Sequence, residues 1–220
     1  SSKFAEQRDI ENVLIVAVTS NRGLCGAFNS NIIKQVTNVA SGYDAKASIF
    51  AIGKKANDAL SKNFEVISNQ SSVFEDLTFD NVATIAEMLM EQFESKAFDK
   101  IEIVYNKFKN AATQEIMTEQ FLPVIALDSS SDSSQDYIFE PTKKKIVETL
   151  IPKSLKTQLY KSLRDSFASE HGARMTAMHK ATDNATELRD QLKLTYNKAR
   201  QASITNEILE IVGGAEALNS

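Results

Sequence analysis

The chain has 220 residues, of which 42% are hydrophobic and 25% are charged, and its formal net charge is −4. This length and composition allow one domain of about 120 residues together with an elongated part. The slight acidity gives no indication of nucleic-acid binding, and no apolar run approaches the roughly 18 residues of a membrane-spanning helix. The single cysteine, Cys25, excludes an intrachain disulfide and fits a reducing compartment.

Strand-like and helix-like segments alternate through the first half of the chain. The continuous apolar run from Val13 to Val18 is typical of a buried strand in a parallel sheet. Four further strands are predicted at Ser48–Ile52, Phe64–Ser68, Lys100–Tyr105 and Gln114–Val124. This alternation predicts an α/β class protein, with a Rossmann-like domain over residues 1–127 and a mostly parallel five-stranded sheet.

Three helices are expected between these strands. Asn29 or Ser30 is expected to cap the first, Gly53 precedes the second around Lys54–Leu60, and Thr78 is expected to cap the third. After the last strand, residues 128–142 read as a crossover loop rich in serine and aspartate, and Pro141 is expected to open the next helix.

The C-terminal part, residues 143–220, is dominated by one long helical pattern. Neither proline nor a pair of glycines interrupts the stretch between Pro152 and Val212, and Gly213-Gly214 is expected to end the helix. Gly172 is the interior glycine, at a cost of about 1 kcal/mol relative to alanine. A helix of roughly 60 residues is about 90 Å long, so we expect it to extend beyond the domain.

An apolar stripe runs along this helix at spacings of three and four residues, close to a heptad seam in its later part. The stripe consists of Leu155, Leu159, Leu163, Phe167, Ala177, Ala181, Ala185, Leu188, Leu192, Tyr196, Ala199, Ser203 and Asn206. Since no other segment of the chain has this length, the stripe predicts that a second helix must lie beside it.

The sequence contains no convincing catalytic, metal or cofactor site. The loop from Arg22 to Gly26 has glycines between a strand and a helix, but it matches neither G-x-G-x-x-G nor G-x-x-x-x-G-K-[ST]. We interpret it as a tight turn in which glycine relieves close helix–strand packing, and Cys25 as a buried structural thiol. His171 and His179 are two helical turns apart, so they are poor co-ligands. We expect no cofactor and no metal.

Several blocks of the sequence resemble one family over essentially the whole chain. They are TSNRGLCGAFN at 19–29, DYIFEP at 136–141, SEHGARM at 169–175, KATDNA at 180–185 and YNKARQASITNE at 196–207. Together they are similar to the γ subunit, or central stalk, of the rotary F-type ATP synthase.

This resemblance implies an architecture with a second long helix. Family members begin with a long N-terminal helix that pairs antiparallel with the C-terminal helix, whereas this chain opens about a dozen residues before its first strand. The long helix would then be half of an antiparallel coiled coil whose partner, the chain's own N-terminal helix, is missing. We expect the isolated chain to bury the orphan seam as a non-native homodimer or to fray it.

The resemblance also implies a function. The chain would be the central rotor shaft, non-catalytic itself, which couples rotation of the membrane ring to conformational changes at the catalytic β subunits. Implied partners are the α and β subunits of the hexamer, the ε subunit and the ring of c subunits, without nucleic acid. The implied location is peripheral, on the cytoplasmic face of a bacterial plasma membrane or the matrix side of the mitochondrial inner membrane.

Three groups of residues match the family's contact positions. A β-subunit contact on the shaft is implied for Arg200, Gln201, Thr205 and Glu207. An apolar bearing tip is implied for Ile208, Leu209, Ile211, Val212 and Leu218. A contact with the rotor ring or ε is implied for Tyr137, Phe139 and Glu140.

The alternative is a nucleotide-binding α/β domain that carries a coiled-coil oligomerisation arm. That function requires a phosphate-binding fingerprint after the first strand and an acidic partner for a ribose after the second. The sequence shows neither, because Gly53-Lys54 follows the second strand.

Overall fold

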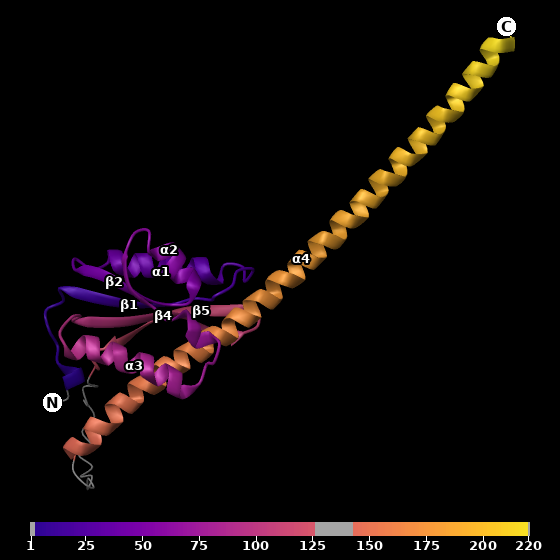
Figure 1. Ribbon diagram of the computed structural model, residues 1–220. Helices are drawn as coiled ribbons and strands as arrows, with labels where there is room; N and C mark the ends of the chain where they lie inside the picture. The colour runs from indigo at the N-terminus through magenta and orange to yellow at the C-terminus, as the bar shows by residue number, and fades with distance from the viewer. Residues whose placement is uncertain (1–2, 126–142, 220) are drawn as a thin grey trace, which may run out of the picture. The chain divides into compact units, whose positions relative to one another are not determined.

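The computed structural model describes residues 3–125 and 143–219 (Figure 1). The elements are a 3₁₀ turn (Lys3–Ala5), β1 (Asn12–Val18), α1 (Phe28–Ser41), β2 (Lys46–Ile52), α2 (Lys54–Leu60), β3 (Glu65–Asn69), a second 3₁₀ turn (Ser71–Phe74), α3 (Phe79–Glu94), β4 (Lys100–Asn110), β5 (Thr113–Leu122) and α4 (Lys143–Asn219). The chain forms two compact units, residues 1–176 and residues 177–220, and α4 contributes to both.

The sheet has the strand order β3-β2-β1-β4-β5. The pairs β1–β2, β2–β3 and β1–β4 are parallel, and only β4–β5 is antiparallel. The prediction of a mostly parallel five-stranded sheet is therefore confirmed. The fifth strand returns beside the fourth as a hairpin, because the turn at residues 110–113 is too short for the crossover that a parallel pair would need.

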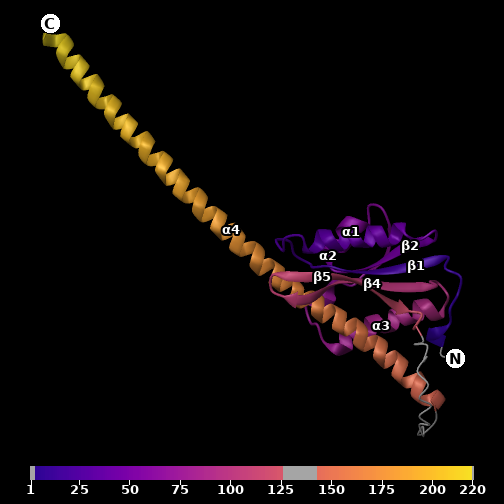
Figure 2. The same cartoon turned by 180° about the vertical axis from the view of Figure 1, so that it is seen from behind.

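Helices cover both faces of the sheet, as the views from the front and from behind agree (Figures 1 and 2). On one face lie α1 and α2, which pack against Val13, Ile15 and Ala17 of β1. On the other face lie α3 and the α4 residues of the first unit, which share a core with the alternate β1 residues Leu14, Val16 and Val18. This two-sided burial explains why β1 reads as a continuous apolar run.

The first part of α4 packs directly on the sheet. Leu155, Leu159 and Leu163 are 3%, 0% and 0% exposed and belong to the same core as Tyr105 and Phe121. The prediction that this part of the stripe needs a second helix was therefore wrong. A spacing of four residues shows that one helix face is buried, but it does not distinguish a sheet from a helix as the covering surface.

The helix is also longer than the sequence predicted. It includes Pro152 and runs through Gly213-Gly214 to Asn219, so the expected stop at the glycine pair was wrong. A glycine that ends a helix adopts a left-handed backbone, and neither Gly213 nor Gly214 has a positive φ. Pro141, the expected first residue of the helix, lies outside the described residues. At α3 the predicted cap is confirmed, because Thr78 Oγ1 accepts a hydrogen bond from the Asn81 amide.

A buried tyrosine of the β4–β5 hairpin lies in the core that α4 covers. Tyr105 is 0% exposed, and its hydroxyl donates to Glu119 Oε1 over 2.7 Å. Next to Glu119 on β5, the carbonyl of Gln120 accepts a hydrogen bond from the side chain of Gln158 on α4 over 3.2 Å. Burial raises the pKa of the Tyr105 hydroxyl, and the carboxylate of Glu119 raises it further, because both disfavour the phenolate.

Among the described residues, no helix combines enough length with enough apolar character to cross a membrane.

We predict that Leu159→Ala lowers the free energy of unfolding by about 2–5 kcal/mol, because it removes a fully buried side chain between α4 and the sheet. Leu194→Ala, on the same helix but 64% exposed, should change it by less than about 0.5 kcal/mol. Urea unfolding followed by the near-UV circular dichroism of the tyrosines measures both. Equal effects of the two variants would contradict the packing of α4 on the sheet.

We predict that the free energy of unfolding falls as the pH rises above about 10, the ordinary tyrosine pKa. The raised pKa of Tyr105 keeps it protonated in the folded protein while the unfolded chain loses the proton, so alkaline pH favours unfolding. Urea midpoints between pH 8 and pH 10.5 should therefore fall less in Tyr105→Phe than in the unchanged chain. Parallel pH profiles would show that Tyr105 titrates normally.

Candidate functional surface

The loop after β1, where a Rossmann-like domain would hold a phosphate, is filled by its own side chains. The Ser20 amide donates to Asn29 Oδ1 over 2.9 Å, and Asn29 Nδ2 donates to Cys25 Sγ over 3.2 Å. The predicted cap by Asn29 or Ser30 was wrong: Ala27 precedes α1 without a side-chain cap, since the amide of Asn29 is used inside the loop. Cys25 is 1% exposed, so its interpretation as a buried thiol is confirmed.

The backbone donors at the start of α2 are occupied in the same way. The amide of Lys54 donates to Asn21 Oδ1 over 3.0 Å, and the amide of Ala56 donates to Thr19 Oγ1 over 2.8 Å. Between them, the amide of Lys55 donates to the Ser20 carbonyl over 3.1 Å. A phosphate at this edge of the sheet would find these donors taken. The geometry therefore does not favour the alternative of a nucleotide-binding domain.

The glycines of this region have different roles from the predicted one. Around Gly23 and Gly26, a Cβ atom would meet nothing within 4 Å, so the predicted relief of close packing was wrong for this loop. Gly26 instead has a φ of +58°, which glycine adopts without strain. Close packing occurs at Gly53, where a Cβ atom would lie 2.2 Å from the Thr19 carbonyl oxygen and φ is +115°.

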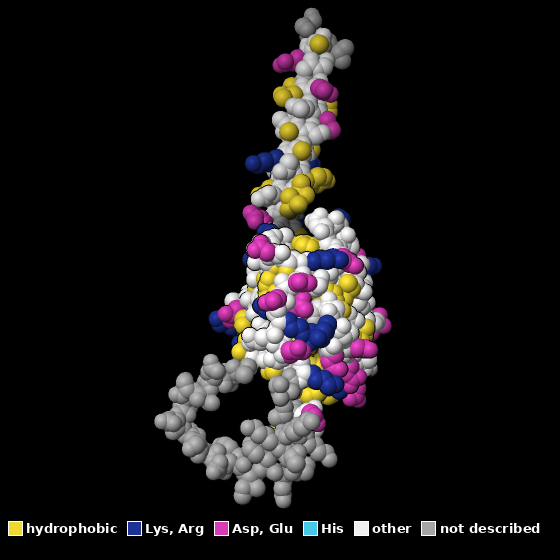
Figure 3. Space-filling model, turned by 90° about the vertical axis from the view of Figure 1, so that its left-hand side faces the viewer, with side chains coloured by type: hydrophobic (Ala, Val, Ile, Leu, Met, Phe, Trp, Pro, Cys, Tyr) yellow, Lys and Arg dark blue, Asp and Glu magenta, His cyan; other side chains and the backbone are white. Residues whose placement is uncertain are grey.

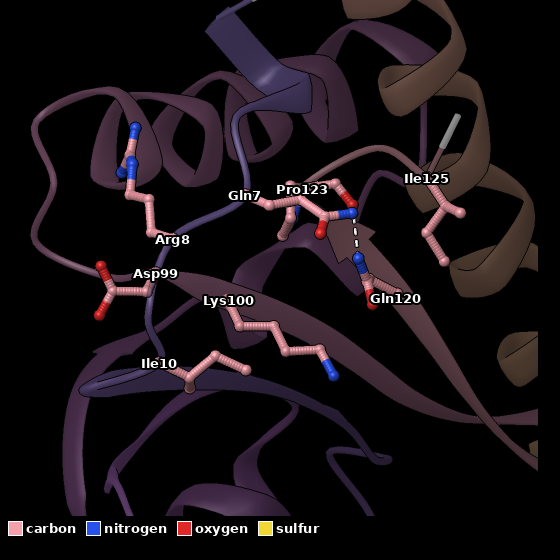
Figure 4. Close-up of a pocket in the computed structure, with 8 residues that line it drawn as sticks. All are labelled: Gln7, Arg8, Ile10, Asp99, Lys100, Gln120, Pro123 and Ile125. Carbon is pink, nitrogen blue, oxygen red and sulfur yellow. Dashed lines mark hydrogen bonds between the residues drawn. The ribbon is translucent and has the colours of Figure 1, made fainter.

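A pocket of about 260 Å³ lies where β4 begins and β5 ends (Figure 4). The charged groups that line it point apart and have partners elsewhere. Arg8 lies 4.6 Å over the ring of Phe93, and Lys100 pairs with Glu102 over 2.9 Å while donating to Tyr43 Oη over 2.7 Å. These charged groups of the described chain therefore do not converge on one point of the pocket.

Across residues 3–125 and 143–219, no group of three or more His, Cys, Asp and Glu side chains is placed to hold a metal ion. His171 packs edge-on against Phe167, with ring centroids 4.6 Å apart. His179 lies eight residues further along α4, as the sequence indicated, and is exposed.

The second unit consists of the later part of α4, and its surface is uncovered within the described chain. Every residue from 178 to 217 is exposed, and Figure 3 shows hydrophobic side chains along this segment between scattered charges. The large apolar side chains at 45% exposure or more are Leu188, Leu192, Leu194, Tyr196, Ile204, Ile208, Leu209, Ile211 and Val212. Exposed large apolar side chains in this number indicate a protein partner.

Two groups of apolar residues in this segment lie on nearly opposite faces of the helix. Since an α-helix turns by about 100° per residue, Leu188 and Leu192 share one face with the small residues Ala181, Ala185 and Ala199. We call this face, defined by these five residues, the small-residue seam. Ile204, Ile208 and Ile211 follow the same 4-3 spacing on the other side of the helix, and we call these three the isoleucine face. The mean directions of the two faces differ by roughly 140°.

All residues of the implied β-subunit contact are exposed on α4. Arg200 and Glu207 lie along one border of the isoleucine face, and Gln201 and Thr205 along the other. These four residues therefore border the isoleucine face, and none of them belongs to the small-residue seam. Of the tip residues, Ile208, Leu209, Ile211 and Val212 are exposed, whereas the side chain of Leu218 and residues Tyr137, Phe139 and Glu140 lie outside the described part.

A contact between the loop after β1 and α4 was not predicted from the sequence. Arg174 Nε donates to the Gly23 carbonyl over 3.4 Å, and Arg174 Nη2 pairs with Glu170 Oε1 over 2.6 Å. Both segments stood out as blocks of resemblance, but no spacing or composition connects residues that are 151 positions apart.

Comparison with known proteins gives consistent results. The family model described as ATP synthase matches residues 1–218. The ATP synthase gamma chain of Flavobacterium psychrophilum is 71% identical over 218 residues, which cover 98% of this chain and 76% of that protein. The ATP synthase gamma chain of Christiangramia forsetii is 64% identical over 220 residues, which cover 99% of this chain and 77% of that protein.

Among solved structures, a chain in the cryo-EM structure of the Euglena gracilis mitochondrial ATP synthase (OSCP/F1/c-ring) has a TM-score of 0.72 and 26% identity, covering 95% of this chain and 73% of that one. The family match extends over nearly the whole sequence, and the bacterial relatives share most of its residues. The chain therefore belongs to the ATP synthase family, as a gamma chain.

Proposed function

We propose that this chain is the central rotor shaft of a proton-translocating F-type ATP synthase. The observation that carries the proposal is the exposed segment of α4 from 178 to 217, whose large apolar side chains find no cover within the described chain. In this role the segment turns inside the hexamer of α and β subunits. Its asymmetry drives the catalytic β subunits through their conformations by rigid-body rotation against bistable partners.

The chain itself performs no chemistry in this proposal. The donors at the β1 and α2 turns are occupied by Asn21, Asn29 and Thr19, and the charges around the pocket point apart. Synthesis and hydrolysis of ATP take place on the β subunits, and this chain supplies the mechanical coupling.

The two faces of α4 suit two different neighbours. The small-residue seam allows the backbone of a second helix to approach closely, as in an antiparallel coiled coil. The isoleucine face remains free for the apolar sleeve of the hexamer. Apolar contacts have no preferred direction, so they suit a bearing that turns under load.

Arg200, Gln201, Thr205 and Glu207 supply directional contacts to a loop of the β subunit beside this bearing. The guanidinium group of Arg200 is suited to this because its rigid fork can pair with a carboxylate through two hydrogen bonds. Tyr137, Phe139 and Glu140 are proposed to face the ring of c subunits or ε.

In this arrangement residues 1–127 form the α/β domain, 128–142 the crossover loop and 143–220 the shaft. The complex lies on the cytoplasmic face of a bacterial plasma membrane, which the bacterial origin of the most similar relatives reported above supports.

We predict that Arg200→Ala weakens ATP-driven proton pumping by the assembled complex by about ten- to one-hundred-fold, since a charge-assisted hydrogen bond is worth about 1.5–3 kcal/mol. Lys198→Ala, which removes an exposed cation two residues away, should pump normally. The assay is fluorescence quenching of a pH-sensitive dye in vesicles that carry the complex. Normal pumping by Arg200→Ala would contradict its assignment to the β-subunit contact.

We predict that the isolated 220-residue chain self-associates through the small-residue seam. Light scattering should give a dimer, and replacing both Leu188 and Leu192 by glutamine should give a monomer. Leu194→Gln is the matched control, because Leu194 is similarly exposed but lies away from the seam. A strictly monomeric chain with a fully formed α4 would contradict this prediction.

A further inference from the structure

The last two turns of α4 within the first unit, residues 169–176, contact two loops of the α/β domain. One is the turn between β4 and β5, residues 110–113, which we call the hairpin turn. The other is the loop after β1, residues 19–27, which we call the Gly23 loop. Thr176 is the last residue of the first unit.

The hairpin turn meets α4 at very short range. A Cβ atom on Gly172 would lie only 2.9 Å from the carbonyl oxygen of Ala111. The hydroxyl of Thr176 lies 3.2 Å from the same oxygen and 3.1 Å from the Gly172 carbonyl, so its one proton is shared between the hairpin turn and the helix. The turn itself is fixed, because Asn110 Oδ1 accepts from the Thr113 amide over 2.8 Å. One turn of helix earlier, Ser169 Oγ donates to the Asn106 carbonyl over 3.1 Å.

The Gly23 loop holds α4 through Arg174. Arg174 Nε donates to the Gly23 carbonyl. The guanidinium group of Arg174 also forms an ion pair of 2.6 Å with Glu170, whose side chain is 12% exposed. The loop is stabilised from within by the side chain of Asn29, whose Nδ2 donates to Ser20 Oγ over 2.8 Å and to Cys25 Sγ. The Arg174 contact therefore ends on an internally bonded loop.

These two sets of contacts lie on nearly opposite sides of the helix. At about 100° per residue, Arg174 is offset by roughly 160° from both Gly172 and Thr176. Earlier in α4, the buried residues Leu155, Leu159 and Leu163 hold the helix by apolar packing, which is non-directional. Hydrogen bonds from opposite sides, in contrast, fix how far the helix can roll about its own axis.

We propose that Gly172, Arg174 and Thr176 are positioning residues that form a torsional clamp with the hairpin turn and the Gly23 loop, through which torque passes between the α/β domain and α4. This proposal rests on the function proposed above. Without the clamp, the part of α4 beyond Leu163 could twist about its axis while the buried leucines stay packed on the sheet, and rotation at one end would be lost before it reached the other.

The first test uses Cys25, the one cysteine of the chain, as a reporter of the Gly23 loop. Since Cys25 is 1% exposed, its reaction with Ellman's reagent requires the loop to open. We expect Arg174→Ala to react at least ten-fold faster than the unchanged chain. Arg164→Ala, which removes an exposed arginine from the same helix, should react at the original rate.

A charge swap separates the clamp from simple helix stabilisation. Glu170→Arg combined with Arg174→Glu restores an ion pair along α4 but leaves no donor at position 174 for the Gly23 carbonyl. The swapped chain should therefore react as fast as Arg174→Ala. Slow reaction of the swapped chain, or of Arg174→Ala itself, would overturn the clamp.

The second test measures coupling in the assembled complex that contains the gamma chain. Arg174→Ala and Thr176→Val should retain ATP hydrolysis but lower the ratio of protons pumped to ATP hydrolysed at least three-fold, and Arg164→Ala should keep the ratio. Thr176→Val replaces the hydroxyl group by a methyl group of similar size, so it guards against a folding defect in the arginine variant.

The outcomes separate the two proposals. If the unchanged chain supports coupled pumping and the clamp variants pump equally well, the clamp does not carry torque even where Cys25 has become reactive. If the unchanged chain neither assembles nor supports pumping, the rotor function fails and the torque role fails with it.

Discussion

Three leucines four residues apart, Leu155, Leu159 and Leu163, attach α4 to the sheet, and the rest of the structure depends on this attachment. Each buried leucine contributes about 1.5–3 kcal/mol through the hydrophobic effect. The same stripe closes the core that β1, α3, β4 and β5 leave open on one face. Because α4 is one continuous helix, its attachment to the domain also determines where the exposed residues after Thr176 begin.

Much of the fold could be predicted from local patterns. The apolar run at Val13–Val18, the alternation of strands and helices and the cap at Thr78 depend on periodicity and side-chain chemistry that act over a few residues. What covers a helix does not depend on such local information. Leu155 and Leu188 stand in the same spacing, yet one is buried by the sheet and the other is 56% exposed.

The same limit explains the errors around the turns. Asn29 has the chemistry of a helix cap, but its side chain bonds Ser20 and Cys25 instead, and sequence alone cannot rank these competing partners. Gly213 and Gly214 have open space around them and continue the helix. The contact residues around Arg200 came from resemblance alone; the structure adds that they border one face of the helix.

The turns at the carboxyl ends of β1 and β2 show how a fold associated with nucleotide binding can serve another purpose. Thr19, Ser20 and Asn21 satisfy the first amides of α2, so this edge of the sheet is closed by internal hydrogen bonds. Bonds that would otherwise hold a ligand instead stiffen the loop on which Arg174 rests.

The exposure of residues 178–217 has a thermodynamic consequence. A helical segment that packs on nothing is held by its backbone hydrogen bonds and by pairs of side chains along one turn, and it melts gradually, residue by residue from its end. The buried core melts as a unit. Heating the chain as a monomer should therefore erode helical content well before the environment of Tyr105 changes, and only a partner helix or a surrounding sleeve would merge the two events into one cooperative transition.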